Sequence, residues 1–126
     1  MIDPGTEFQF TPHAAHCAAP ATHTRCYSTD WVVPESLPYF NGHFPGLPVL
    51  PAVAIIDATA ELIGQALGTG AANLTGVKSA KFMSPITPGL SLNIYIHEIS
   101  ATEWLAEWRN PALPPDGLVA LLTVRL

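Results

Sequence analysis

Apolar positions recur along this chain with two different periods, which predict one long helix and several strands. Between Pro51 and Leu67 they recur at steps of three and four residues, the period of a helix with an apolar stripe. The stripe consists of Val53, Ile56, Ala60, Ile63 and Leu67, and it is widened by Ile55, Ala58, Leu62 and Ala66. Pro51 suits the first turn, where its missing N–H would have no helical partner, and Gly68 and Gly70 are expected to end the helix.

The other periodic segments are short and typical of strands. In Leu90–Ile99 apolar and polar residues alternate strictly at first, as in an antiparallel strand that is buried on one face. We expect strands at Thr22–Val33, Leu74–Met83, Leu90–Ile99, Glu103–Arg109 and Leu118–Leu126. This order predicts an α+β fold in which an antiparallel sheet wraps around one long central helix.

The length of 126 residues predicts a single domain, which we place at residues 22–126. Residues 9–21 are rich in Ala, Pro and His without periodicity and are interpreted as a loose lead-in. The first eight residues end in Gly-Thr-Glu-Phe, which two adjacent cloning sites would encode. Residues 1–8 are therefore interpreted as a cloning remnant outside the fold.

Composition narrows the class of function. Charged residues make up only 12% of the chain, about half the usual share, so we expect a partner to cover part of the surface. Five Lys and Arg against ten Asp and Glu argue against nucleic-acid binding. No apolar run reaches the roughly 18 residues of a membrane span. Cys17 and Cys26 lack metal-ligand spacing and follow no secretory signal, so we expect thiols of a cytoplasmic protein rather than a disulfide.

The candidate chemistry lies between Pro34 and the helix. The segment from Pro34 to Pro51 has five prolines and two glycines, so it is irregular but has few conformations to lose. It contains His43, and Asp57 follows fourteen positions later on the expected helix. An imidazole is suited to removing a proton from carbon, and a carboxyl group kept protonated by burial is suited to donating one. The alternative is a surface histidine, with Asp57, Glu61 and Gln65 forming the solvated face of an ordinary amphipathic helix.

These residues match a known pattern. The segment Phe40–Pro51, followed by Asp57, resembles the signature of the hotdog-fold 3-hydroxyacyl-[acyl carrier protein] dehydratases. The segment Val77–Gly89 resembles the next conserved block of that family, in which a Lys-Phe strand leads to a Pro-Gly turn. The resemblance covers residues 22–126 and is closest to the small stand-alone dehydratases of aryl polyene-type clusters.

The resemblance implies a lyase that converts a 3-hydroxyacyl thioester into a trans-2-enoyl thioester. His43 would take the α-proton, and Asp57 of the partner chain would protonate the leaving hydroxyl. The substrate would arrive on the phosphopantetheine of acyl carrier protein, with no cofactor and no metal. The implied assembly is a homodimer with sheets joined edge to edge, and a trimer of dimers is left open.

Further residues are expected around the substrate. The amide of Ala52 or Val53, at the helix N-terminus, would bind the thioester carbonyl, although relatives usually carry Gly at position 52. Phe44 and Phe82 would contact the acyl chain. Glu61 stands where relatives commonly carry Gln, and two carboxylates one helical turn apart repel each other.

Two other functions fit the same residues. A hotdog thioesterase would hydrolyse the thioester, and a non-catalytic hotdog protein would only bind acyl carrier protein. The non-catalytic alternative is supported by Ala52 and Glu61, where relatives usually carry Gly and Gln, and by the small number of basic residues. Lys78 and Lys81 are three apart and would lie on opposite faces of a regular strand, so at most one is expected to face an acidic carrier protein.

Overall fold

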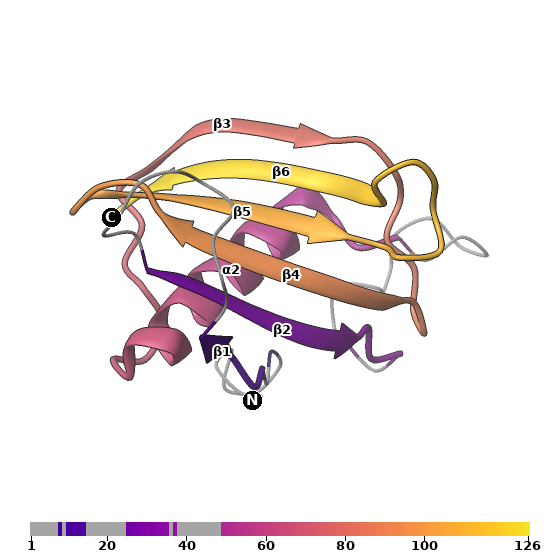
Figure 1. Ribbon diagram of the computed structural model, residues 1–126, viewed down its shortest axis with the longest axis horizontal. Helices are drawn as coiled ribbons and strands as arrows, with labels where there is room; N and C mark the ends of the chain where they lie inside the picture. The colour runs from indigo at the N-terminus through magenta and orange to yellow at the C-terminus, as the bar shows by residue number, and fades with distance from the viewer. Residues whose placement is uncertain (1–7, 9, 15–24, 36, 38–48) are drawn as a thin grey trace.

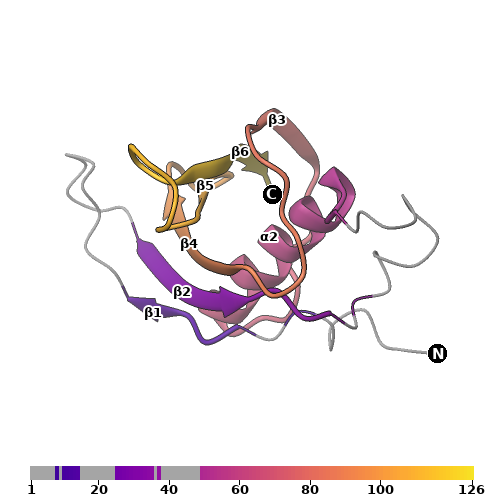
Figure 2. The same ribbon diagram turned by 90° about the vertical axis from the view of Figure 1, so that its right-hand side faces the viewer.

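The computed structural model describes residues 8, 10–14, 25–35, 37 and 49–126. Within these residues, six strands form one antiparallel sheet in the spatial order β1-β2-β4-β5-β6-β3. The elements are β1 (His13–Ala14), β2 (Cys26–Val32), α2 (Ala52–Leu67), β3 (Gly76–Phe82), β4 (Ser91–Glu98), β5 (Glu103–Arg109) and β6 (Leu118–Arg125). In Figure 1 the sheet lies in front of α2, and Figure 2 shows the sheet bending around that helix. The predicted α+β architecture is confirmed.

Most predicted elements are found within two residues of their expected ends. The helix begins one residue later than predicted because Pro51 is its N-cap, with extended backbone at φ −72° and ψ 160°. Gly68 ends it in the left-handed conformation at φ 71°, which glycine adopts without steric cost. Only β1 was not predicted, since two residues carry no detectable period.

The core lies between the sheet and one side of α2. Alternate residues of β4 and β5, such as Ile94, Ile96 and Trp108, are fully buried against the helix. The helix presents small side chains there, including Ala54 and Ala58, so the sheet can approach closely. Val53, the first residue of the predicted apolar stripe, is 57% exposed, so this end of the stripe is not buried in the single chain. The helix is apolar on several sides, and periodicity alone does not select which side faces the sheet.

The segment before β1 belongs to the fold. Phe8 and Phe10 are buried and pack against Trp31, with ring centroids 5.9 and 5.3 Å away. Gln65 of α2 holds their backbone, because its Nε2 donates to the Phe8 carbonyl at 2.8 Å and its Oε1 accepts from the Phe10 amide at 3.0 Å. The interpretations of residue 8 as lying outside the fold and of residues 10–14 as loose are therefore wrong. Phe8 and Phe10 are isolated aromatic residues outside any periodic segment, so the sequence did not indicate that they are buried.

No helix in the described part of the chain is long and apolar enough to cross a membrane.

Candidate active site

A pocket of about 350 Å³ lies where the N-terminus of α2 meets the end of β3. One wall is formed by residues 49–52 and Ile55, and the other by residues 82–86. The Leu50 amide donates to the Ile86 carbonyl at 2.8 Å and so fixes the two walls to each other. The chain continues past β3 along β6, because the Met83 amide donates to the Val119 carbonyl at 2.8 Å. The result is a largely apolar recess beside a helix N-terminus.

The helix N-terminus offers backbone donors to this recess. Its first acceptor, the Pro51 carbonyl, receives the amides of Ala54 at 3.0 Å and Ile55 at 3.2 Å, and Pro51 provides no side-chain cap. The amides of Ala52 and Val53 precede these and have no backbone acceptor among the described residues. Ala52 lines the pocket, whereas Val53 is exposed beside it. Such amides are suited to binding a developing negative charge on a carbonyl oxygen.

The two helix carboxylates lie on a face of α2 that is not covered by the described strands. Asp57 is exposed and Glu61 is half-buried, and they follow exposed Val53 at steps of four, on the same side of the helix. Ala54 and Ala58 are fully buried against the sheet, whereas Asp57 is exposed, so the expected burial of this carboxyl group is not found in the single chain. Further along the same helix, the side chain of Gln65 is hydrogen-bonded to the backbone of Phe8 and Phe10.

His43 and Phe44 lie outside the described residues, so their roles stay predictions. Of the other predicted residues, Ala52 and Phe82 meet in the pocket, while Val53, Asp57 and Glu61 do not line it. The sequence analysis did not identify Leu50, Ile55 and Ile86 as pocket residues. The two walls of the pocket are far apart in the sequence, and no local pattern indicates that they meet. Among the described residues, no cluster of three His, Cys, Asp or Glu side chains is suited to a metal ion.

Strand β3 has an irregular register that changes the distribution of charge. Val77 pairs with Val124 and Ser79 with Thr123, so Lys78 is the extra residue of a β-bulge. Lys78 Nζ lies 3.5 Å from Glu103, to which Arg125 Nε also donates at 3.3 Å, on the side of the sheet turned away from α2.

Lys81 pairs with Leu121, which faces the same side as Thr123. The prediction that Lys78 and Lys81 lie on opposite faces of the sheet is therefore wrong. It assumed a regular strand, and the bulge shifts the alternation by one residue.

Comparisons with known proteins give a consistent picture. The family model described as ApeI-like, ApeI dehydratase, matches residues 19–109. The chain is 32% identical over 90 residues to the 3-hydroxyacyl-[acyl-carrier-protein] dehydratase FabZ of Syntrophotalea carbinolica, covering 66% of this chain and 61% of the relative. It is 32% identical over 91 residues to the FabZ of Zymomonas mobilis, covering 66% and 58%. The chain thus spans about three-fifths of the length of these curated relatives.

Solved structures show the same fold. An uncharacterized protein from Erwinia carotovora superposes with a TM-score of 0.70 at 22% identity, covering 92% of this chain and 94% of that one. The dehydratase heterocomplex ApeI:P from Xenorhabdus doucetiae superposes with a TM-score of 0.62 at 23% identity, covering 91% and 96%. At these identities the likeness concerns the fold alone, and the predicted hotdog fold is confirmed.

Proposed function

The chain belongs to the ApeI-like dehydratase family, and from this premise we propose that it removes water from a 3-hydroxyacyl thioester to give a trans-2-enoyl thioester. One observation carries the proposal within the described residues. A pocket at the N-terminus of α2 is followed, about 7.5 Å further along the helix axis, by the exposed acid Asp57. Donors for a carbonyl oxygen and an acid for a leaving group are thereby placed on one helix.

In the proposed mechanism His43 removes the α-proton of the substrate. The amide of Ala52 or Val53 binds the thioester carbonyl, which stabilises the charge that develops on its oxygen. Asp57 protonates the 3-hydroxyl, which leaves as water. Elimination then restores the carbonyl and creates the double bond. The proton taken by His43 passes to Asp57, so that both groups return to their starting states.

We propose that the site is shared between two copies of the chain. Strand β3 is one of the two edges of the described sheet, and Val77–Phe82 is exposed along its whole length. Large apolar residues are exposed on this strand and beside it: Val77 at 41%, Phe82 at 43%, Met83 at 46% and Val53 at 57%. A second copy added at this edge would pair the outer backbone groups of β3, cover these side chains and bring its own His43 segment to the open face of α2.

A homodimer is the simplest such assembly, and a trimer of dimers would extend it. The Xenorhabdus protein is described as a heterocomplex, so a related but different chain is the competing partner. Mass measurement of the purified protein alone distinguishes the two, because a chain that requires a different partner stays monomeric.

We propose acyl carrier protein as the donor of the substrate, which it carries on phosphopantetheine without any further cofactor. The bulge in β3 supports this partner, because it places Lys78 and Lys81 on the same face of the sheet as Arg125, next to the same edge. Glu103 is the acid on this face, and it pairs with Lys78 and Arg125. Such a surface attracts an acidic protein modestly. A cytoplasmic location is part of the same proposal.

The decisive experiment is an assay of purified protein on 3-hydroxyacyl thioesters, followed by the absorbance of the enoyl product. His43→Ala and Asp57→Asn are each expected to lower turnover by about 100-fold or more, the scale of lost acid–base catalysis. Glu35→Gln, which also removes an exposed carboxylate, is the matched control and leaves turnover unchanged.

Other outcomes identify the alternatives. Release of thiol without enoyl product indicates a thioesterase, and binding of acyl carrier protein without either product indicates a non-catalytic protein. Undiminished turnover in His43→Ala would refute the mechanism.

A further inference from the structure

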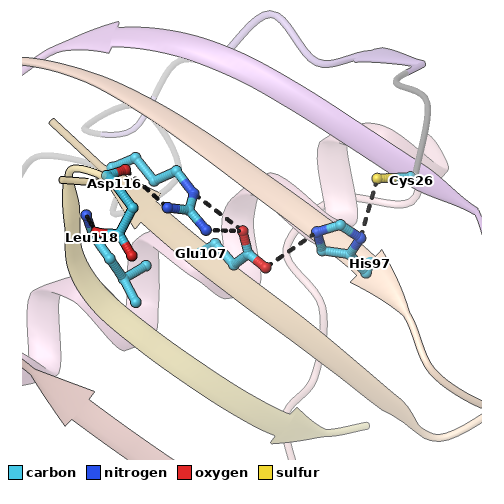
Figure 3. Close-up of polar contacts among 6 residues, drawn as sticks. Cys26, His97, Glu107, Asp116 and Leu118 are labelled. Atoms are coloured by element: carbon cyan, nitrogen blue, oxygen red, sulfur yellow. Dashed lines mark hydrogen bonds and ion pairs between the residues drawn. The ribbon is translucent and has the colours of Figure 1, made fainter. Parts of the chain in front are cut away.

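A thiol, an imidazole and a carboxylate lie in line on the face of the sheet that points away from α2 (Figure 3). They come from three adjacent strands: Cys26 begins β2, His97 lies near the end of β4, and Glu107 is in β5. Cys26 and His97 are direct partners in the register, and Sγ lies 3.3 Å from Nδ1. None of the three lines the pocket at the helix N-terminus.

The alternation of the strands explains why these side chains face outward. Ile96 and Trp108, the neighbours of His97 and Glu107 in sequence, are fully buried against α2, so His97 and Glu107 point the other way. Yet the group is well covered. Cys26 is 6% exposed, and the side chains of His97 and Glu107 are 17% and 22% exposed.

The carboxylate is held in place from its far side. Oε2 of Glu107 accepts hydrogen bonds from Arg109, at 2.8 Å from Nη2 and 3.2 Å from Nε. Arg109 in turn donates to the Asp116 carbonyl at 2.9 Å. The other carboxylate oxygen, Oε1, lies 3.7 Å from His97 Nε2.

The imidazole is therefore poised between two groups. Its Nδ1 faces the thiol, and its Nε2 is a buried nitrogen that points toward Glu107 and has no hydrogen-bond partner among the described residues. A distance of 3.7 Å is too long for a hydrogen bond, so the neutral ring leaves Nε2 unsatisfied. A proton accepted at Nδ1 would make the ring cationic and turn the approach of Glu107 into an ion pair. Nucleophile, base and orienting acid in this order are the arrangement that activates a thiol.

We propose that Cys26 is a reactive thiol that undergoes thiol–disulfide exchange with small disulfides. The Cys26 thiol gives its proton to His97 Nδ1, and the thiolate attacks one sulfur of the disulfide. A new S–S bond joins Cys26 to that sulfur while the bond within the reagent breaks. The departing thiolate takes the proton from His97, so that Cys26 is oxidised and one sulfur of the reagent is reduced. Neither His43 nor Asp57 takes part, so this site stands or falls separately from the proposed dehydration.

Reactivity in the folded protein distinguishes this site from an inert buried thiol. An ordinary thiol is only a few per cent ionised at pH 7, and burial alone makes it less reactive still. Activation by His97 increases the thiolate fraction. The lower nucleophilicity of a more acidic thiol offsets part of this gain, so the rate of exchange is expected to rise by about threefold or more.

The test uses the whole wild-type chain with oxidised glutathione at pH 7, followed by peptide mass mapping. Trypsin cleaves after Arg25 and so separates Cys17 and Cys26, which reports the rate of each thiol in one sample. We expect Cys26 to react about threefold or more faster in the folded protein than in the same chain unfolded in urea. Slower reaction of Cys26 in the folded state would overturn the proposal, and this comparison requires no variant.

Two substitutions test the roles of the neighbours. His97→Gln keeps a polar side chain of similar reach but accepts no proton, and it is expected to bring the folded rate below the unfolded one. Glu107→Gln should lower the folded rate by a smaller factor. Circular dichroism verifies that each variant is folded. An unchanged rate in folded His97→Gln would show that His97 does not activate the thiol and would also overturn the proposal.

Discussion

The indole Nε1 of Trp108 donates a hydrogen bond to Oγ1 of Thr59 at 3.2 Å, in the centre of the core. Both residues are fully buried, and the bond joins β5 to α2. The Thr59 hydroxyl donates in turn to the Ile55 carbonyl at 2.8 Å. A polar atom on a large aromatic residue is thus satisfied by one hydroxyl on the facing helix, which also fixes the orientation of the indole ring.

Replacement of Thr59 by Val keeps the shape of the side chain and removes this hydroxyl. The indole N–H is then buried without an acceptor, which should lower the free energy of unfolding by about 1–3 kcal/mol. Urea denaturation measures the change. Thr123→Val, on the opposite face of the sheet, is the matched control and should change stability by less than about 0.5 kcal/mol. Equal effects of the two substitutions would contradict the assigned role of the Thr59 hydroxyl.

Gly64 permits a close return of the chain over α2. A Cβ atom at position 64 would lie 1.5 Å from the carbonyl oxygen of Gly70 and 2.8 Å from Cα of Ala71. These contacts are with backbone, so Gly64→Ala should displace the segment after the helix and lower the free energy of unfolding by about 3 kcal/mol. A Cβ at Gly76 would have nothing within 4 Å among the described residues, so Gly76→Ala is the control and should be nearly neutral in thermal denaturation. A neutral Gly64→Ala would show that the segment moves freely.

The ion pair of Arg25 and Glu98 should make part of the stability depend on pH. The Arg25 guanidinium lies 2.5 Å from the Glu98 carboxylate, and this hydrogen bond lowers the pKa of Glu98 below its ordinary value of 4.5. Because the folded state has the lower pKa, the stabilisation is complete above the ordinary value and is lost as the pH falls through the lowered one.

Arg25→Met should therefore raise the pKa of Glu98 toward 4.5, as measured by NMR titration of its carboxyl group. The stability difference between wild type and this variant should shrink as the pH falls below about 4. Lys81→Met removes an exposed positive charge with no ion pair among the described residues and serves as the control. A pKa of Glu98 that does not move in Arg25→Met would contradict the interpretation.

Phe82 should limit the length of the acyl chain if the pocket holds it. Each buried CH₂ contributes about 0.8 kcal/mol, so kcat/KM should rise with chain length and then fall abruptly where the pocket ends. Phe82 lines the pocket, and Phe82→Ala should move this break to longer chains. Val77→Ala, on the same strand but outside the pocket, should leave the break in place. A wild-type profile that is flat with chain length would instead indicate a substrate lying in an open groove.

A shared active site predicts complementation between two inactive variants. If His43 of one chain acts with Asp57 of the other, each mixed dimer of His43→Ala and Asp57→Asn contains one intact site. Random mixing should then restore about a quarter of the wild-type activity, since half of the dimers are mixed and each has one working site. The two variants are unfolded together, refolded and assayed, and each refolded alone is the control. Absence of any recovery would place both residues of a site in one chain.

The elements and their order follow from local properties of the sequence. The helix at Ala52–Leu67 and the strands β3 to β6 lie within two residues of their predicted ends, because period and turn residues belong to short stretches of chain. The residues around His43, with Asp57 fourteen positions later, likewise indicate the family without any knowledge of contacts. These features depend only on residues that are close together in the sequence, so the sequence alone is enough to predict them.

Which surfaces meet is a property of the tertiary structure. Three features depend on contacts between segments far apart in the chain. They are the exposure of Val53 and Asp57 on α2, the burial of Phe8, and the pairing of Cys26 with His97. The bulge at Lys78 shows the same limit, because one extra residue in the register changes which face a side chain occupies, and the register is set by the neighbouring strand. An apolar helix fits a sheet on several sides, and packing against the whole sheet selects one of them.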